Sequence, residues 1–222
     1  MKKALILLLF FNLLISSSKV AVAIKINGKV SLVSSKDRSK TLLKPGTPLN
    51  DKDKVMTSKD SFAAIMYLDD KSVIKVLSNS DLTIIGERLK KVISKSLDIG
   101  YGKITANIAK QKGNEFRIST PTSVASVKGT ELAITSDPSN GDSFTLLEGL
   151  IEVTNSITGE SMEVSQGETA VSTPQGSLEV EATTIEDMEG FEQAEVEIPA
   201  QDLRFEVEDA DGNIKEIIIK FR

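Results

Sequence analysis

The sequence contains no cysteine and no histidine, and these two absences exclude whole classes of chemistry. Disulfides cannot form, and the usual zinc and copper sites lack their thiolate and imidazole ligands. A Ser-His or Cys-His catalytic pair is equally impossible, and the most common general acid–base is missing. A hydrolase that works only through paired carboxylates is the remaining enzymatic alternative. The residues therefore predict a protein that is not an enzyme and that holds no metal and no cofactor.

Aromatic residues and glycine-rich phosphate motifs are also scarce. There is no tryptophan, and the two tyrosines are Tyr67 and Tyr101, so the flat aromatic walls typical of sugar sites are hard to build. Neither G-x-G-x-x-G nor G-x-x-x-x-G-K-[ST] occurs. A lectin or carbohydrate-active enzyme is therefore disfavoured, and a nucleotide-binding loop is not expected.

The charges are unevenly distributed along the chain. Residues 24–178 hold 20 basic and 18 acidic residues, whereas residues 179–222 hold 4 basic and 14 acidic residues. The body is thus close to balanced and the tail is acidic. Because phosphate binding needs a concentrated positive surface, nucleic acid is not an expected partner.

The first residues predict export. Lys2 and Lys3 precede an apolar run over residues 4–15, and a small-residue pattern follows at Ala21 and Ala23. A basic start, a short apolar core and small residues at a cleavage site are typical of a secretory signal peptide. We expect a signal peptide over residues 1–23 and a periplasmic or secreted product; a retained anchor is the alternative. After signal cleavage no membrane span is expected, since no later run is long enough.

The body of the chain predicts short β strands. Apolar residues alternate in several runs, for example Phe116 and Ile118 around Arg117, which places them on one buried face. Residues 62–68 are apolar on both faces and fit a strand that is covered on both sides. Glycines recur at Gly149, Gly159, Gly167 and Gly176, each before another strand-like run. Such regular spacing favours a sandwich, a barrel or a solenoid.

The tail predicts two further units. Residues 181–199 form an acidic linker or short helix, with Ile185, Met188 and Phe191 at helix-like spacing. Residues 200–222 read as a C-terminal β-hairpin around a turn at residues 211–213. The returning strand is apolar on both faces and suits docking on a partner through Ile217, Ile219 and Phe221.

Four ordered stretches resemble the FecR domain, a bacterial envelope module. They cover residues 43–57, 61–72, 116–134 and 147–168, and together they define a FecR-like β domain over residues 24–180. The residues that carry the resemblance are Gly46, Asp53, Thr57, Asp69, Asp70, Ser72, Thr120, Pro121, Gly129, Thr130, Glu148, Gly149 and Gly167. Turn chemistry explains these residue types, so we expect them to be structural corners of the fold.

The resemblance implies an all-β fold, built as a twisted β-solenoid or β-helix-like stack, with a β-sandwich as the alternative. Family members that regulate iron uptake join this domain to a cytoplasmic anti-sigma segment, which we do not find before the predicted signal. The expected function is protein–protein interaction in envelope signalling or scaffolding, with an envelope protein of unknown identity as partner. A module that binds polysaccharide or the cell wall is the alternative.

Overall fold

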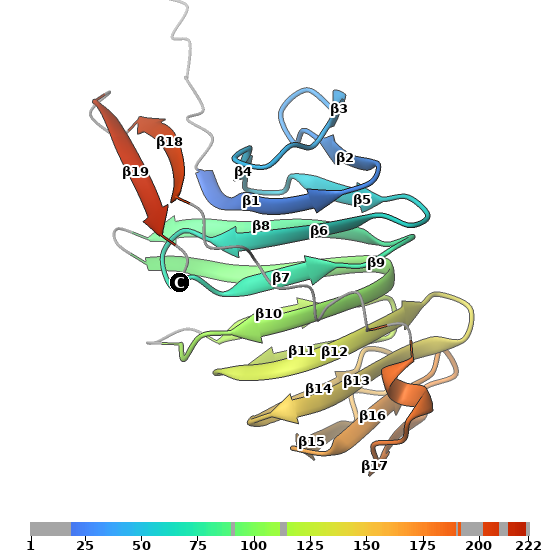
Figure 1. The fold of residues 1–222 in the computed structure, drawn as a ribbon. Helices are drawn as coiled ribbons and strands as arrows, with labels where there is room; N and C mark the ends of the chain where they lie inside the picture. The colour runs from blue at the N-terminus through green and yellow to red at the C-terminus, as the bar shows by residue number, and fades with distance from the viewer. Residues whose placement is uncertain are drawn as a thin grey trace, which may run out of the picture.

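The computed structural model describes residues 19–89, 92–111, 115–189, 191, 202–208 and 213–220. The regular structure is almost entirely β strand, with one short 3-10 helix, η1 (Glu186–Met188). The strands are β1 (Lys19–Asn27), β2 (Val30–Val33), β3 (Lys40–Leu42), β4 (Pro48–Asn50), β5 (Lys54–Thr57), β6 (Phe62–Tyr67), β7 (Val73–Val76), β8 (Asp81–Leu89), β9 (Val92–Ile108), β10 (Phe116–Ser119), β11 (Ser123–Val127), β12 (Thr130–Asp137), β13 (Gly141–Glu148), β14 (Leu150–Asn155), β15 (Ser161–Ser165), β16 (Glu168–Ser172), β17 (Leu178–Ala182), β18 (Asp202–Glu208) and β19 (Ile214–Lys220). Figure 1 shows β3 and β4 near one end of the stack and β15 and β17 near the other.

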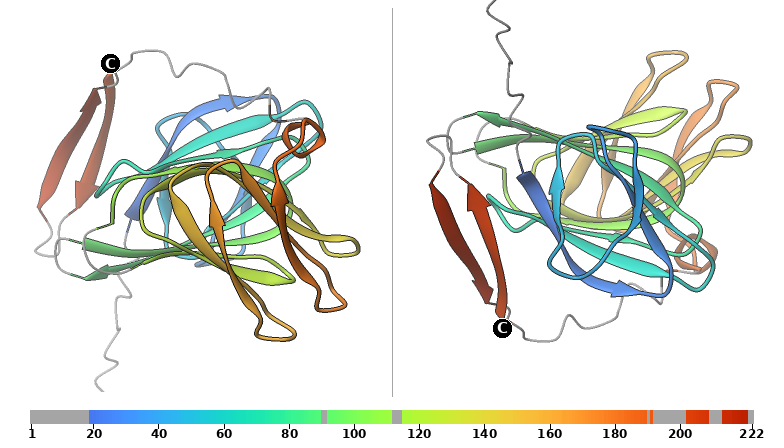
Figure 2. Two further views of the ribbon diagram at one scale, coloured as in Figure 1. Left: turned by 90° about the horizontal axis from the view of Figure 1, so that it is seen from below. Right: turned by 90° about the horizontal axis from the view of Figure 1, so that it is seen from above.

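Strands β1 to β17 form one continuous sheet that doubles over into two layers (Figure 2). Layer A has the order β4-β1-β6-β7-β9-β12-β13-β16-β17. Layer B has the order β3-β2-β5-β8-β9-β10-β11-β14-β15. The long strand β9 belongs to both layers, because its first half pairs with β8 and its second half with β7 and β12.

The all-β fold class is confirmed, but the solenoid is not. Among the described strands, β9 and β10 make the one parallel pair, and all other pairs are antiparallel. Rungs that coil in one direction would pair in parallel, whereas hairpins that return on themselves pair antiparallel. After β5 in the sequence, the chain passes from one layer to the other at the end of each hairpin or at the bend in β9. The arrangement is therefore a single, mostly antiparallel sheet that folds over on itself.

The main core lies between the two layers and follows the period-two pattern of the sequence. In β10, Phe116 and Ile118 are fully buried and Arg117 is exposed. The ring of Phe116 meets the ring of Tyr67 from the opposite layer edge to face, with centroids 5.5 Å apart. Such aromatic pairs add roughly 0.5–1.5 kcal/mol to the burial of the rings themselves.

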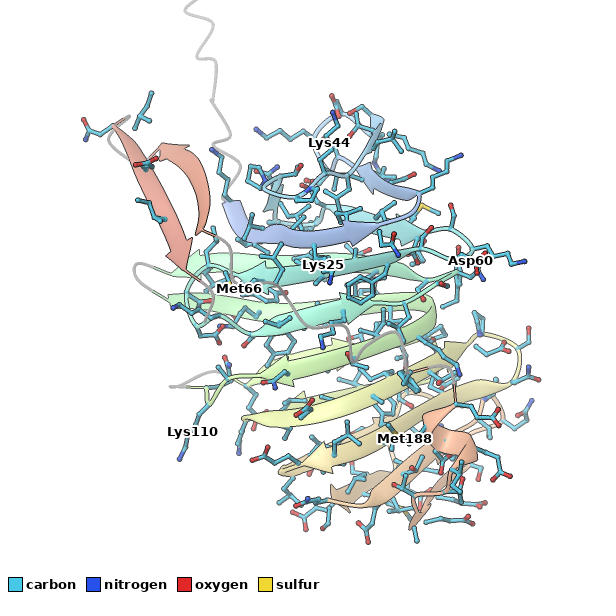
Figure 3. The ribbon with its side chains drawn as sticks, viewed as in Figure 1. Lys25, Lys44, Asp60, Met66, Lys110 and Met188 are labelled. Atoms are coloured by element: carbon cyan, nitrogen blue, oxygen red, sulfur yellow. The ribbon has the colours of Figure 1, made fainter. Side chains whose placement is uncertain are left out.

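A smaller apolar cluster covers the outer face of layer A and explains why β6 is apolar on both faces. Every residue of β6 is buried. Val22, Phe62 and Met66 form this outer cluster together with Phe191, and Met188 packs against it (Figure 3). The chain after β17 thus returns over the outer face of layer A.

The returning segment contains a short helix, one of the two alternatives predicted for residues 181–199. Met188 and Phe191 contact the outer cluster, but Ile185 is 87% exposed, and the helix is a single 3-10 turn. The backbone carbonyl of Glu189 accepts a hydrogen bond from Lys103, whose Nζ lies 5.1 Å from the centroid of the Phe191 ring. Residues 190 and 192–199 of the predicted linker lie outside the described residues.

A bend inside β9 joins the two layers. The sequence predicts a turn at Gly100-Tyr101-Gly102; instead the strand continues and changes layer there. Gly102 has a φ of +105°, and a Cβ on it would lie 2.3 Å from Oγ of Ser80 and 2.5 Å from its Cα. Only glycine fits this close approach of two backbones.

The C-terminal hairpin is present as the antiparallel pair β18–β19, with Leu203 opposite Ile219 and Phe205 opposite Ile217. The side chains of Ile217 and Ile219 and the whole of Phe221 lie outside the described residues, so docking through them stays a prediction. Residues 1–18 of the predicted signal also lie outside. Within the described residues, none of the helices is long and apolar enough to cross a membrane.

Candidate functional site: a buried lysine cluster and two charged ends

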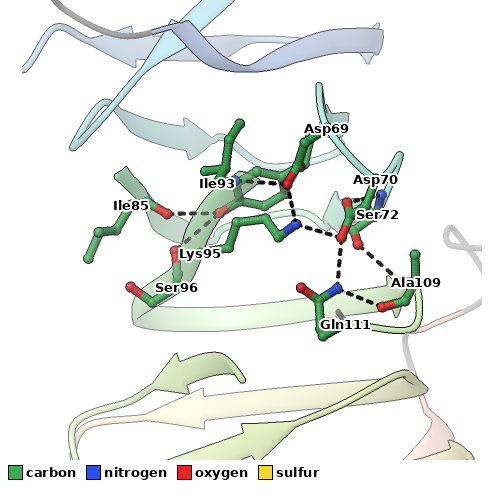
Figure 4. A network of polar contacts seen from close by, with 10 residues as sticks. Asp69, Asp70, Ser72, Ile85, Ile93, Lys95, Ser96, Ala109 and Gln111 are labelled. Carbon is green, nitrogen blue, oxygen red and sulfur yellow. Dashed lines mark hydrogen bonds and ion pairs between the residues drawn. The ribbon is translucent and has the colours of Figure 1, made fainter. Parts of the chain in front are cut away.

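The most unusual polar site is a buried lysine that bridges two neighbouring aspartates (Figure 4). Asp69 and Asp70 lie in the turn of the hairpin formed by β6 and β7. The side chain of Lys95, from β9, is only 2% exposed, and its Nζ lies 2.8 Å from Oδ2 of Asp69 and 2.5 Å from Oδ2 of Asp70. We call Lys95, Asp69, Asp70 and Gln111 the Lys95 cluster.

The remaining hydrogen-bonding capacity of the cluster is used by its neighbours. Oδ2 of Asp70 accepts from Nε2 of Gln111 at 2.7 Å, and its Oδ1 accepts from the Ser72 N–H at 2.9 Å. Oδ2 of Asp69 accepts from the Ile93 N–H at 3.1 Å. Each carboxylate is therefore held by an ammonium and by at least one further donor, as a buried charge requires.

Protonation in the cluster follows from these contacts. Partial burial raises the pKa of Asp70, but hydrogen bonds from Lys95, the Ser72 N–H and Gln111 outweigh it and lower the pKa below its ordinary value. Burial, with the nearby charges of Asp70, Asp69 and Asp51, raises the pKa of Tyr67 well above its ordinary value. The Tyr67 hydroxyl thus stays protonated and donates toward the backbone carbonyls of Ser96 at 3.1 Å and Ile85 at 3.3 Å.

The Lys95 cluster ties the β6–β7 hairpin of layer A to β9 and is suited to stability, not to proton transfer. The sequence analysis identified Asp69, Asp70 and Ser72 as corner residues but missed Lys95 and Gln111. In the sequence, the basic cluster of Arg88, Lys90, Lys91 and Lys95 predicts a solvated strand face, and this prediction is wrong for Lys95, whose side chain is only 2% exposed. The burial of Lys95 could have been predicted from its place in the strand. Every second residue along this part of β9, Ile93, Lys95 and Leu97, faces the same side, and all three are buried.

The motif residues in the first third of the chain are also bonded internally. Asp53 is 1% exposed and accepts from the Ser35 N–H at 2.9 Å and the Asn50 N–H at 2.8 Å. The Thr57 hydroxyl donates to the carbonyl of Leu77. The Gly46 N–H donates to the carbonyl of Ala23 in β1 at 2.8 Å.

The later motif residues occupy corners between strands. Thr120 and Pro121 lie between β10 and β11, and the Thr120 hydroxyl accepts from the Ser123 N–H at 3.1 Å. Gly129 and Thr130 lie at the start of β12, where a Cβ on Gly149 would lie 2.7 Å from Cγ2 of Thr130. Exposed Glu148 ends β13, and the Gly167 N–H donates to the carbonyl of Leu146 at 2.9 Å.

A second buried polar corner escaped the sequence analysis. The side chain of Asp142 accepts from the Thr122 N–H at 2.9 Å and from its hydroxyl. Nearby, Nδ2 of Asn155 donates to Oγ of Ser172 at 2.8 Å. These residues join β13, β14 and β16 to the turn before β11. They carry no pattern in the sequence, because the contacts connect residues up to 50 positions apart.

Within the described residues, a groove beside Tyr101 is a candidate place for a ligand. Tyr101, 41% exposed, lies in an open groove that is lined by Ser78, Asn79, Gly102, Lys103, Thr135, Ser136, Asp137 and Pro138. In the part of the chain that the structure describes, no three acidic side chains gather as a metal site would require.

The two ends of the stack carry opposite charge. Residues 19–128 contain 21 basic and 10 acidic residues, whereas residues 129–189 contain 13 acidic residues and no lysine or arginine. The first range builds β1 to β11 and the second builds β12 to β17, so the charge changes sign along the stack (Figure 1). The nearly equal numbers of basic and acidic residues over residues 24–178 conceal this difference in charge between the two ends.

Exposed side chains display this polarity at the strand edges. At the acidic end, Glu163 in β15 and Glu179 and Glu181 in β17 are exposed, and these two strands end the two layers. Figure 3 shows Lys44 at the opposite end. The exposed basic residues there are Lys36, Arg38, Lys40, Lys44 and Lys52.

The middle of the chain is similar to a known family of proteins. Residues 53–152 match the family model described as FecR protein. Two solved structures of a candidate anti-sigma factor from Parabacteroides distasonis are similar. One has a TM-score of 0.50 at 12% identity and the other 0.48 at 13%, and each match covers 58% of this chain and 59% of that chain. The chain thus spans about three fifths of the length of each of these two relatives. No curated protein matches.

Proposed function

Since the FecR resemblance is confirmed for residues 53–152, we propose that this chain is an exported, non-catalytic module that binds another envelope protein in signalling or scaffolding. The resemblance implies a regulatory module whose extracytoplasmic domain contacts another protein. The titratable motif residues support the same conclusion, because Asp53, Asp69 and Asp70 already have internal partners.

The observation that carries the proposal is the acidic end of the stack. Glu152 and Glu163 lie directly opposite one another in the β14–β15 pair, and both are exposed. Like charges in facing positions destabilise a sheet. A partner that presents lysine or arginine to this end would relieve the repulsion and would be drawn to it from a distance. We therefore assign the partner surface to the edges formed by β15 and β17.

Crosslinking in intact cells tests this assignment. We expect the wild-type chain to form an adduct with one envelope protein, and the variant Glu179→Lys/Glu181→Lys to bind at least about tenfold more weakly, since the loss of two charge contacts of about 0.7 kcal/mol each already removes about 1.4 kcal/mol. The matched control is Glu87→Lys/Glu115→Lys, which reverses two exposed carboxylates in the basic half. It should crosslink like the wild type.

Three outcomes would contradict the assignment. Recovery of the wild-type chain as a monomer alone would reject protein binding. Equal losses in both double variants would reject the acidic end as the specific surface. If truncation after residue 199 abolishes the adduct while Glu179→Lys/Glu181→Lys retains it, the terminal hairpin is the docking element instead.

A cell-wall ligand is the second candidate, and the groove beside Tyr101 is the observation that favours it. An exposed aromatic ring among polar groups is the usual surface for a sugar. The test is sedimentation with purified peptidoglycan, in which Tyr101→Ala should lose the pelleted fraction if the groove binds. We expect the wild-type chain to remain in the supernatant, because a single ring offers too little stacking area.

A further inference from the structure

We propose that signal cleavage occurs between Ser18 and Lys19, five residues before the Ala21-x-Ala23 pattern ends, so that the mature protein begins with the first residue of β1. This inference rests on the export proposed above. It concerns a processing site, and it follows from where the first strand begins and how deeply it is buried.

The first half of β1 belongs to the folded protein. Val20, Ala21, Val22 and Ala23 are each 0% exposed. Ala21, Val22 and Ala23 pair with β6, with Ala21 opposite Tyr67 and Ala23 opposite Ile65. Because β1 also pairs with β4, these residues lie in a strand that is paired on both sides and not at a frayed end. Signal peptides are removed from the mature protein, whereas these residues form part of both apolar clusters.

Cleavage after Ala23 would leave several backbone groups without partners. The Ala23 N–H donates to the carbonyl of Thr47 at 3.0 Å, and the Ala23 carbonyl accepts from Gly46 at 2.8 Å. The carbonyl of Val20 accepts from the Leu68 N–H at 3.0 Å. A new ammonium group would also stand at Ile24, which is only 7% exposed. Unpaired backbone groups and a buried unpaired charge both oppose folding.

Packing accounts for the small residues that imitate a cleavage site. Ala21 and Ala23 lie in the main core beside Val20. In the facing strand β8, a Cβ on Gly86 would lie 2.8 Å from Cβ of Val20, so β1 and β8 approach closely here. Small side chains suit such a position, and the alanines therefore need no second role in processing.

Earlier in the sequence there is a second site with small residues at the two positions that a signal cleavage site requires. Ser16 and Ser18 are small residues with one residue between them, directly after the apolar run of residues 4–15. A signal of 18 residues is within the usual range of about 15–30. Cleavage there would leave β1 complete, since the strand begins at Lys19.

The test is the N-terminal sequence and intact mass of the full-length precursor after expression in an exporting cell. We expect Lys19 as the first residue. The variant Ser18→Phe should block cleavage, because it places a large side chain directly before the cut. The matched control Ser17→Phe changes the neighbouring position, whose size is not restricted, and should be processed normally. Neither variant alters β1.

The alternatives give different results. A mature chain that begins at Ile24, with normal processing of Ser18→Phe, would overturn the inference and leave export intact. An uncut chain in the membrane fraction would overturn it in favour of a retained anchor. An uncut chain in the cytosol would overturn both this inference and the proposed export.

Discussion

Replacing Lys95 by methionine is expected to lower the free energy of unfolding by about 3 kcal/mol, the lower end of the cost of breaking a buried ion pair. The substitution keeps most of the apolar stem but leaves Asp69 and Asp70 facing each other without their ammonium partner. For a chain of this size the melting temperature should fall by about 6–12 °C. Denaturant unfolding followed by circular dichroism measures the change.

The control for Lys95→Met is the same substitution at an exposed pair. Lys128 is 77% exposed and lies 3.1 Å from Glu115. Exposed pairs contribute about 0–1 kcal/mol, so Lys128→Met should change stability little. The triple variant Lys95→Met/Asp69→Asn/Asp70→Asn should recover part of the loss, because it removes both kinds of charge. Equal effects at Lys95 and Lys128 would contradict a buried role for the cluster.

Acid should weaken the same cluster. Because hydrogen bonds from Lys95, Ser72 and Gln111 outweigh burial and lower the pKa of Asp70, its stabilising effect is present above the unfolded pKa of about 4. The stabilisation is lost as the pH falls below 4 and passes through the pKa that Asp70 has in the folded protein. Unfolding midpoints measured from pH 6 to pH 3 should fall more steeply for the wild type than for Asp70→Asn. The exposed variant Asp98→Asn should follow the wild type; parallel curves for all three proteins would refute the prediction.

Replacing Gly102 by alanine is the second change with a large expected effect. The bend of β9 requires a φ of +105°, and the new Cβ would lie 2.5 Å from the Cα of Ser80, a backbone atom that cannot swing aside. Backbone strain and overpacking cost about 1–3 kcal/mol each, so we expect a loss of roughly 2–4 kcal/mol. The measurement is again denaturant unfolding.

The variant Gly159→Ala separates the cost of backbone strain from the cost of overpacking. Gly159 also has a positive φ, +74°, but nothing lies within 4 Å of an added Cβ. Its substitution should cost only the backbone strain, about 1 kcal/mol. If both variants lose the same stability, the close approach of β9 to Ser80 does not restrict residue 102, and the bend is not the joint between the layers.

Much of the local structure could be predicted from the sequence because strand patterning is a local property. Alternation around Arg117 placed Phe116 and Ile118 in the core, and the continuous apolar run of residues 62–68 predicted a strand covered on both faces. The terminal hairpin followed from its turn residues. The absence of cysteine and histidine limited the available chemistry without any knowledge of the fold.

The three-dimensional structure decided what depends on residues far apart in the chain. The residues around Lys95 in the sequence predict a lysine in contact with solvent. Only the way in which the strands pair brings it to two aspartates that lie 25 and 26 positions away in the chain. Antiparallel hairpins, and not parallel rungs, were selected by how the strands pair across the molecule. The opposite charges of the two ends arise because the stack keeps the order of the chain. Local patterns determine which side chains face inward, but which strand lies beside which is settled by packing the whole sheet.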